Sequence, residues 1–368
     1  MKNKTETFKT VVCGTAFGIF YIEAIKRAFP DFELAGIVAN GSERSIKCAQ
    51  NYNTRLYRSA EDIPDDIDLA CVAVRSSSLG GAGTDLSVGF LKRGISVILE
   101  QPVHQNDLQL CFKTAQKNGC RFMVGDLYLN MPEVRRFLNV CEYMRSIGQY
   151  PEYITAKSSV QAFYPFVDIL GKIIPDGEVE VKSVGEQFGS FKEIMCGIGG
   201  VPLSIQYNNK MNPKDPDNHM QVLHSFCCYY PTGRLELVDT RGPLIWYPRM
   251  NMPWSVLDEG RLPDVYPKHM YDASVQILTR DLSSIAKPYY KYAEDSWVDS
   301  ITRDLMEIRS LTFDRRRFIM KSQQEQKSAK LWNELSQIFG FAALDSSLKP
   351  EPADLSGIFD ASILRGEE

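Results

Sequence analysis

The sequence of 368 residues lacks three features that would place it in common protein classes. It has no run of about 18 apolar residues, which a membrane-spanning helix needs. Its net charge is −4, so no basic surface invites nucleic acid or anionic lipid. Its 4 histidines and 9 cysteines show no metal-ligand spacing, and we expect no catalytic metal. The composition, 44% hydrophobic and 24% charged, is ordinary for a soluble globular protein.

The cysteines also bear on the compartment. Their number is odd, and most lie in apolar patterns, where cysteine behaves as a small hydrophobic residue. This usage favours a reducing compartment over a disulfide framework. The first ten residues are polar and lead directly into an apolar strand, unlike a signal peptide. We therefore expect a cytoplasmic protein.

The first part of the chain alternates strands with helices. Five short apolar segments have the pattern of buried strands, at residues 10–13, 32–40, 68–76, 95–101 and 121–128. Alternation with short connections predicts an α/β Rossmann-type fold with a doubly wound parallel sheet. In such sheets ligands bind at the carboxyl ends of the strands.

The pattern changes after Ile147. Longer strand-like segments predict an α+β domain with a largely antiparallel sheet, and amphipathic segments at 295–308 and 317–339 close the fold. We therefore predict three parts. These are a nucleotide-binding Rossmann-like domain over 1–147, an α+β substrate and dimerisation domain with C-terminal helices over 148–343, and an irregular tail over 344–368.

The turn after the first strand is a candidate phosphate site. It reads Gly14-Thr15-Ala16-Phe17-Gly18, one residue short of the dinucleotide fingerprint and with alanine at the second glycine. The first glycine can still make the tight turn, and the helix that follows offers free N–H groups to a pyrophosphate. An ordinary glycine turn has the same sequence, so this motif alone decides little.

The end of the second strand indicates which dinucleotide binds. NAD enzymes normally carry Asp or Glu there, to hold the ribose 2′-hydroxyl. This chain has Asn40, followed by Ser42, Arg44 and Ser45, which suit a 2′-phosphate. The alternative is an N-cap serine beside a solvated arginine. Together with the glycine turn, the pattern favours NADPH or NADP+.

Two further strand ends belong to the same rim. Arg75 and Ser76 precede a glycine-rich turn over residues 80–84 that includes Gly83, although a flexible loop has a similar sequence. The segment VILEQPVH (97–104) ends a buried strand at Glu100, which can accept hydrogen bonds from ribose hydroxyls. The following proline turns the chain so that Gln101 faces the cofactor, and a cis peptide bond is possible there.

These motifs, in this order, resemble the glucose–fructose oxidoreductase/inositol dehydrogenase superfamily. Within it they resemble thiazolinyl imine reductases of yersiniabactin- and pyochelin-type siderophore assembly. The similarity continues through Tyr128, through Asp215-Pro216-Asp217-x-His219 and through Gly242-Pro243-x-Ile245-Trp246. It implies NADPH-dependent reduction of a thiazoline C=N to a thiazolidine. The substrate would be a siderophore intermediate on the carrier domain of a nonribosomal peptide synthetase, and the protein a homodimer.

One departure from the superfamily concerns the proton. The signature Glu-Lys-Pro reads Glu100-Gln101-Pro102 here, and an amide cannot give up a proton. The resemblance places Tyr128, a phenol with an ordinary pKa of about 10, at the substrate, as the candidate acid. Solvent water is its rival, and Gln101 is expected to hydrogen-bond the carboxamide or the substrate. Candidate substrate residues, each of which also fits a packing or loop role, are His104, His219 and Trp246.

Two other functions remain open at this point. A sugar or polyol NAD(P)-dependent dehydrogenase of the same superfamily needs a base for carbinol oxidation, and Gln101 is not one. A non-catalytic NADP-binding redox sensor would share the cofactor residues but would not need Tyr128 beside an open cleft. Cofactor turnover with a thiazoline distinguishes the three functions.

Overall fold

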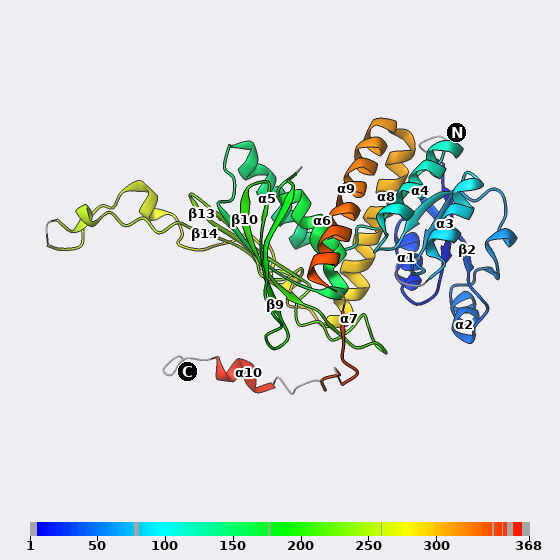
Figure 1. Cartoon of the computed structure of the whole chain (residues 1–368). Helices are drawn as coiled ribbons and strands as arrows, with labels where there is room; N and C mark the ends of the chain where they lie inside the picture. The colour runs from blue at the N-terminus through cyan, green and yellow to red at the C-terminus, as the bar shows by residue number, and fades with distance from the viewer. Residues whose placement is uncertain are drawn as a thin grey trace.

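The computed structural model describes residues 6–76, 81–175, 177–258, 260–340, 342–347, 349–351 and 356–362. Two large sheets, each with its own helices, lie side by side, and two long C-terminal helices stand between them (Figure 1). Residue 80 of the glycine-rich turn and parts of the predicted tail lie outside the described residues.

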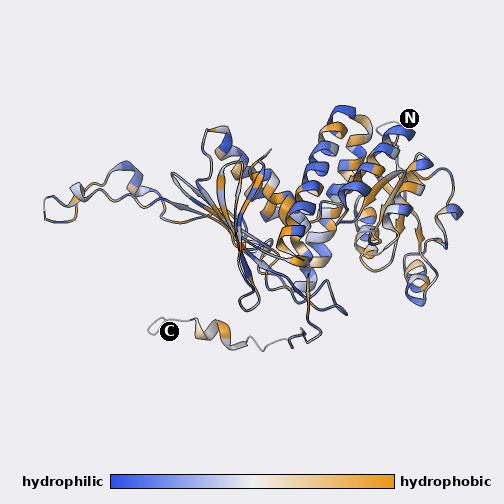
Figure 2. Cartoon of the chain, viewed as in Figure 1, coloured by the Kyte–Doolittle hydropathy of each residue, from blue (hydrophilic) through white to orange (hydrophobic). Residues whose placement is uncertain are grey.

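The first sheet is parallel and six-stranded, with the order β3-β2-β1-β4-β5-β6. Its strands are β1 (Phe8–Cys13), β2 (Phe32–Val38), β3 (Leu56–Tyr57), β4 (Leu69–Val72), β5 (Ser96–Leu99) and β6 (Phe122–Val124). Every residue of β4, β5 and β6 is buried, as expected for a parallel sheet with helices on both faces. The apolar strands stand out among hydrophilic helix faces in Figure 2. The predicted Rossmann-type sheet is confirmed.

Four helices connect these strands and bring their own N-termini to the rim. They are α1 (Gly18–Arg27), α2 (Glu43–Asn51), α3 (Gly83–Lys92) and α4 (Gln105–Asn118). Each begins just after a strand ends, so the carboxyl ends of β1, β2, β4 and β5 face helix N-termini along one edge. The helix α4 ends at Gly119, whose φ of 71° suits glycine.

The second sheet has eight strands in the order β15-β14-β13-β12-β7-β10-β9-β8 and is antiparallel except at the β7–β10 pair. Its strands are β7 (Tyr153–Ser159), β8 (Val179–Val184), β9 (Lys192–Ile198), β10 (Val201–Asn208), β12 (His224–Tyr230), β13 (Gly233–Leu237), β14 (Leu244–Pro248) and β15 (Gln276–Ile277). A small second pairing joins β11 (Lys210–Met211) to β16 (Ala343–Leu344). The α+β domain with a largely antiparallel sheet is confirmed.

Helices cover one face of the second sheet. The helix α5 (Pro132–Ser146) contacts β13 and β14, and α6 (Phe163–Ile173) contacts β7. Side chains that point to this face, such as Ile205 and Leu235, are fully buried. Side chains that point to the opposite face, such as Met195 and Tyr229, are exposed. We call this opposite side the open face.

The chain returns to the first domain through its last helices. A short turn, α7 (Tyr289–Lys291), leads through a π-helical segment into α8 (Val298–Phe313), and Asp314 caps α9 (Arg315–Phe339). The helix α8 packs on α1, while α9 packs on both α4 and α6. These two helices therefore contact elements of both domains.

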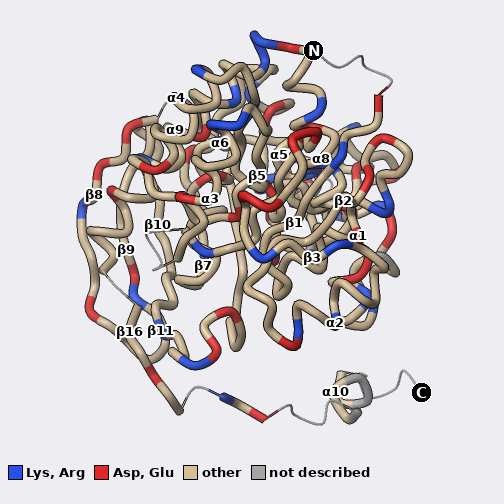
Figure 3. Tube along the Cα trace, turned by 90° about the vertical axis from the view of Figure 1, so that its right-hand side faces the viewer, with Lys and Arg blue, Asp and Glu red and all other residues tan. Residues whose placement is uncertain are grey.

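Residues 249–275 leave the second sheet after β14 and rejoin it at β15. The only helical elements in the described residues of this segment, which we call the arm, are short 3₁₀ turns, and the segment extends away from the Rossmann-type domain (Figure 1). Charges of both signs are interspersed along the whole chain (Figure 3). Among the described residues, no helix has the length and apolar character required to cross a membrane.

Candidate functional site

The glycine turn after β1 has the geometry of a phosphate-binding turn. Gly14 has a φ of +92°, and a Cβ there would lie 2.8 Å from the carbonyl oxygen of Ala73. Only glycine fits both constraints. The helix α1 starts at Gly18 with Phe17 as N-cap residue and no side-chain cap. Its first N–H groups are therefore available to an anion, with Thr15 and Ala16 completing the turn.

The end of β2 uses its serines for the backbone. The Asn40 side chain accepts from the N–H of Ser42 at 3.2 Å, and the Ser42 hydroxyl caps α2 by accepting from the N–H of Ser45 at 3.3 Å. The hydroxyl of Ser45 donates to the Ser42 carbonyl, and Ser45 is fully buried. Ser45 is thus a structural part of this cap, and its hydroxyl already has an acceptor. Arg44 remains exposed and borders a cavity of about 480 Å³.

A second arginine at this strand end was not identified from the sequence. Arg58 follows β3, and its guanidinium lies directly against Gly41, where a Cβ would meet Nη1 at 2.1 Å. Gly41 has a φ of +80°, a backbone conformation that favours glycine, whereas the Arg58 side chain could move away from a Cβ. Arg44 and Arg58 both lie beside the loop that holds Asn40, which places two guanidinium groups at the end of the second strand, where dinucleotide-binding folds hold the adenosine ribose.

The chain that follows β4 is held close to the chain that follows β5. The hydroxyl of Ser76 donates to the carbonyl of Pro102 at 2.8 Å, and Ser76 is 1% exposed. A Cβ on Gly83 would lie 2.3 Å from the Val74 carbonyl oxygen, so this glycine allows α3 to begin against the strand end. Arg75 pairs at 3.4 Å with Asp217, in a loop of the second domain. This contact brings that loop over the cofactor rim.

Glu100 and Gln101 lie at the end of β5, and the Gln101–Pro102 peptide bond is cis. The hydroxyl of Tyr21 donates to Oε2 of Glu100 at 2.7 Å. Burial raises the pKa of Glu100 to about 7, partly offset by this hydrogen bond. The Nε2 of Gln101 is buried and has no hydrogen-bond partner among the described residues. A buried donor of this kind calls for an acceptor from a ligand.

Tyr128 lies beyond β6 and faces the second domain. Its ring meets the edge of His224 at a centroid distance of 5.1 Å. Burial raises its pKa, and the nearby Glu100 raises it further. No described residue hydrogen-bonds the Tyr128 hydroxyl. The phenol therefore keeps its proton at neutral pH and has a free hydroxyl to offer.

A cavity of about 260 Å³ lies near this tyrosine, although Tyr128 is not one of its lining residues. Tyr289 and Tyr292 line it and are near enough to Tyr128 to interact with it electrostatically. Arg241, which is paired with Asp239 at 3.0 Å, forms another part of the wall. The lining combines aromatic faces with charged groups, which suits an aromatic ligand that carries polar atoms.

The histidines have structural partners. His104 is the N-cap of α4: its Nδ1 accepts from the N–H of Asn106 at 3.2 Å, and its Nε2 lies 3.2 Å from Oδ1 of Asn333. His219 has a φ of +65° and contacts Asp215 at 2.9 Å within the loop that reaches Arg75. His224 is fully buried between Thr240 and the Ala162 carbonyl, and burial lowers its pKa to about 4.

Trp246 is part of the second sheet. It lies in β14, its ring is 6.1 Å from that of Tyr230, and it packs over Gly233. A Cβ on Gly233 would meet its ring at 2.7 Å. These contacts give Trp246 a packing role; its role toward a substrate stays a prediction, as do those of His104 and His219.

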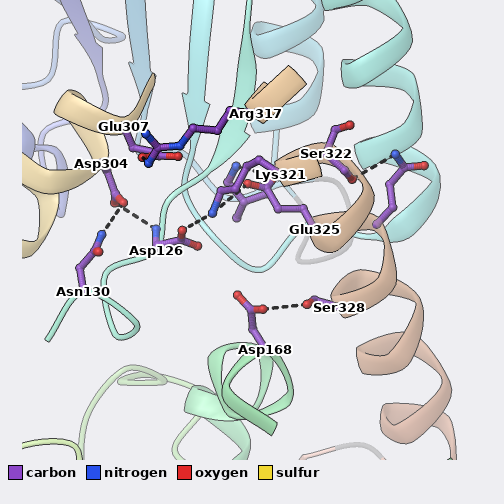
Figure 4. A network of polar contacts seen from close by, with 12 residues as sticks. Asp126, Asn130, Asp168, Asp304, Glu307, Arg317, Lys321, Ser322, Glu325 and Ser328 are labelled. Carbon is purple, nitrogen blue, oxygen red and sulfur yellow. Dashed lines mark hydrogen bonds and ion pairs between the residues drawn. The ribbon is translucent and has the colours of Figure 1, made fainter. Parts of the chain in front are cut away.

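A cluster of buried charges supports the end of β6 (Figure 4). Lys321, on α9, donates to Asp126 and lies 3.3 Å from Glu325. The N–H of Asp126 donates to Asp304 at 3.0 Å, and the N–H of Val124 donates to Glu325 at 3.1 Å. Burial raises the pKa of Glu325 to about 8, although Lys321 opposes this, and burial raises that of Asp304 well above its usual range.

This cluster adjoins the cofactor rim. A Cβ built on Gly125 would lie 2.7 Å from the Tyr21 hydroxyl, 3.4 Å from Oε2 of Glu100 and 3.6 Å from Oδ2 of Asp304. The sequence contained no signal for it, because its members come from β6 and from helices α8 and α9, far apart in the chain. The cluster therefore fixes the loop that carries Tyr128. Its residues share no sequence motif, so the sequence alone does not bring them together.

The residues present fit a bound dinucleotide. The glycine cradle at Gly14 has no room for a side chain, the first amides of α1 are open, and Gln101 has an unpaired buried donor. The described residues contain no group of three or more His, Cys, Asp or Glu placed to hold a metal ion.

Comparison with known proteins agrees with both domains. Residues 8–126 match the oxidoreductase family with an NAD-binding Rossmann fold, and residues 149–247 match the C-terminal domain of Irp3-like thiazolinyl imine reductases. No curated protein matches the chain.

Solved structures share the fold at low sequence identity. The UDP-N-acetylglucosamine 3-dehydrogenase GnnA from Acidithiobacillus ferrooxidans is 12% identical, with a TM-score of 0.61 over 93% of this chain and 99% of that one. The 3-ketoreductase KijD10 from Actinomadura kijaniata, in complex with NADP and TDP-benzene, is 14% identical, with a TM-score of 0.60 over 89% and 96%. A dehydrogenase from Chromobacterium violaceum is 11% identical, with a TM-score of 0.63 over 90% and 95%.

The two family matches together cover the first sheet, the cofactor rim and the second sheet from β7 to β14, but not β15. The protein is therefore an NAD(P)-dependent oxidoreductase in which a Rossmann-fold domain of the NAD-binding oxidoreductase family is followed by a domain that matches the C-terminal domain of Irp3-like thiazolinyl imine reductases.

Proposed function

We propose that this protein reduces the C=N bond of a thiazoline to a thiazolidine with NADPH. The observation that carries the proposal is the match of residues 149–247 to the C-terminal domain of thiazolinyl imine reductases. That domain supplies the wall of the cavity beside Tyr128, including Asp239, Arg241 and Gly242. The residues that resemble an imine reductase thus form part of this wall, and Ile285, Lys287, Tyr289 and Tyr292 form the rest.

The proton comes from Tyr128. When bound, the nicotinamide supplies a hydride to the ring carbon of the C=N bond. The ring nitrogen then carries the electron pair and is strongly basic, so it takes the proton of the Tyr128 hydroxyl even though burial raises the pKa of that phenol. Gln101 cannot titrate. Its unpaired Nε2 donates a hydrogen bond to the nicotinamide carboxamide or to the substrate and so positions the reactants.

The preference for NADPH rests on the end of β2. Arg58 lies against Gly41 in the loop that begins at Asn40, and Arg44 follows that loop in the first turn of α2. Two guanidinium groups attract a 2′-phosphate, and no carboxylate occupies position 40 to hold a 2′-hydroxyl. In the part of the chain that the structure describes, the cysteines are buried and unpaired with one another, which fits a cytoplasmic enzyme.

The substrate is proposed to arrive as a thioester on the carrier domain of a nonribosomal peptide synthetase. The cavity beside Tyr128 is lined by Tyr289 and Tyr292, which can hold an aryl-thiazoline, and Lys287 and Arg241 provide positive charge there. A tethered substrate enters from the outside of such a cavity, so its carrier needs only to dock at the cavity mouth.

Replacing Arg44 with alanine is expected to raise the KM for NADPH by about 10- to 100-fold and to leave the KM for NADH nearly unchanged. The loss corresponds to charge-assisted hydrogen bonds worth about 1.5–3 kcal/mol. Steady-state kinetics measure the KM for each of the two cofactors. Lys47→Ala is the matched control, because Lys47 borders the same cavity but pairs with Glu43. Equal increases for both cofactors would contradict the assignment.

A substrate panel separates the proposed function from its alternatives. We expect NADPH oxidation with a hydroxyphenyl-thiazoline thioester, and no NADP+ reduction with polyols or nucleotide sugars. Activity on sugars would make the protein a dehydrogenase like its structural neighbours. Tight NADPH binding without turnover on either class, carrier-bound thiazolines included, would favour a redox sensor.

A further inference from the structure

Glu100 adjoins a buried cluster of acidic side chains that has too few cations to be fully ionised. The other acidic members are Asp126, Asp304 and Glu325, which Figure 4 shows around Lys321. Among the described residues, Lys321 is the one cation that contacts them. Four carboxylates and one ammonium would leave several uncompensated charges away from water, which is costly. We therefore expect at least one of the four carboxyl groups to hold a proton at neutral pH.

Glu100 is placed to exchange its proton with the cofactor site. It directly follows β5 and precedes Gln101, whose buried Nε2 lacks an acceptor. It also keeps some exposure at the rim, whereas Asp304 and Glu325 are only 1% and 4% exposed. In a sheet of this strand order, a dinucleotide binds across the crevice between the two halves, with its adenosine at the end of β2. The nicotinamide half is then held at the strands on the other side of β1, which include β5.

The groups around Glu100 act on its proton in opposite directions. Burial raises the pKa of Glu100 to about 7, and the charge of Asp126 raises it as well. The hydrogen bond from Tyr21, at 2.7 Å, and the N–H of Gln101 favour the carboxylate. The other titratable groups near enough to interact with Glu100 electrostatically are Cys71 of β4, Asp304 of α8 and Tyr128.

We propose that Glu100 is the proton store of the reaction, protonated when NADPH is bound and ionised when NADP+ is bound. Loss of its hydride gives the nicotinamide ring a positive charge, which stabilises a nearby carboxylate. This inference rests on the proposed function, because reduction of a C=N bond consumes one proton for each hydride. The hydride forms the C–H bond, Tyr128 gives its proton to the nitrogen, and the Glu100 proton restores that of Tyr128. Glu100 takes a new proton from solvent when NADPH replaces NADP+.

Calorimetric titration of each cofactor into the full-length protein tests this linkage without any thiazoline. Near pH 7, in buffers of different ionisation enthalpy, NADP+ is expected to release about half a proton more than NADPH, because Glu100 is then about half protonated. The 2′-phosphate is common to both cofactors, so its own titration cancels in this difference. By the same linkage, the ratio of the dissociation constant of NADP+ to that of NADPH should fall about five- to tenfold from about pH 6 to about pH 8.

Three variants show whether Glu100 is responsible. Glu100→Gln should abolish both the difference in proton release and the pH dependence of the ratio. Glu307→Gln is the matched control and should retain both, because it removes a carboxylate of α8 that the exposed Arg317 already pairs. Tyr21→Phe keeps the Glu100 carboxyl but removes a hydrogen bond that favours its ionised form. The pH of greatest proton release should therefore rise by about one unit in this variant.

Equal proton release with NADP+ and NADPH in the wild type would overturn the proposal, as would a difference that survives in Glu100→Gln. If Glu100→Gln does not fold or does not bind cofactor, Tyr21→Phe decides: a rise in the pH of greatest release supports the proposal, and an unchanged pH overturns it. A wild type that shows the linkage but reduces no thiazoline would refute the proposed substrate and retain the linkage. Thiazoline reduction without the linkage would refute only the proton store.

Discussion

Replacing Lys321 with methionine is expected to lower the free energy of unfolding by about 3–5 kcal/mol, the range for breaking a buried ion pair by removing one partner. Lys321 donates to Asp126 and lies 3.3 Å from Glu325, and its side chain is only 13% exposed. Burial lowers the pKa of Lys321, but Asp126 and Glu325 raise it more, so the ammonium is charged. Without it, acidic groups remain buried with no cation.

Urea unfolding followed by circular dichroism measures this loss. Lys330→Met is the matched control, since Lys330 lies on the same helix and pairs at 3.7 Å with Glu334, but is 69% exposed. An exposed pair at this spacing is worth only about 0.3–0.5 kcal/mol. Equal losses in the two variants would show that the cluster at the end of β6 does not stabilise the loop that carries Tyr128 as described.

Replacing Tyr128 with phenylalanine is expected to lower kcat for thiazoline reduction by about 10²- to 10⁴-fold, the usual contribution of a positioned general acid. The dissociation constant for NADPH should not change, because the ring and its contact with His224 are retained. Single-turnover and binding measurements on the same preparation separate the two effects.

Tyr292→Phe is the matched control for this experiment. Tyr292 lines the same cavity, but its hydroxyl lies 3.6 Å from the sulfur of Met131, a weak acceptor. Loss of the Tyr292 hydroxyl should change kcat by less than about fivefold, which is a small fraction of the effect of a positioned acid. If Tyr128→Phe retains full activity, the proton comes from water or another group.

The parallel sheet and its rim could be predicted from the sequence. Apolar strands that alternate with helices commonly form a parallel sheet covered by helices. The carboxyl ends of these strands then meet at one edge of the sheet. Gly14 illustrates why such motifs can be read: its φ of +92° and a 2.8 Å approach to Ala73 leave no choice of residue. The two amphipathic segments predicted to close the fold are present as the helices α8 and α9, and the bond before Pro102, for which the sequence left a cis form open, is cis.

The rest of the site depends on contacts between distant parts of the chain. Tyr21 reaches Glu100 from α1, and Arg58 reaches Gly41 from β3, but neither pair shares a motif. The helix α5 and the division of residues 233–248 into two strands at Gly242 were also not predicted. Local sequence patterns report burial and turns, whereas side-chain partners follow from packing of whole elements.

The most direct test of the central claim is the fate of the hydride. A single turnover with NADPH deuterated at C4 and a hydroxyphenyl-thiazoline thioester should place one deuterium on the thiazolidine ring carbon, detected by mass spectrometry, with matching loss of nicotinamide absorbance. Tyr128→Phe should slow the transfer without changing its product. Oxidation of NADPH with no deuterium in a thiazolidine, or no oxidation even with the carrier-bound substrate, would contradict imine reduction by this protein.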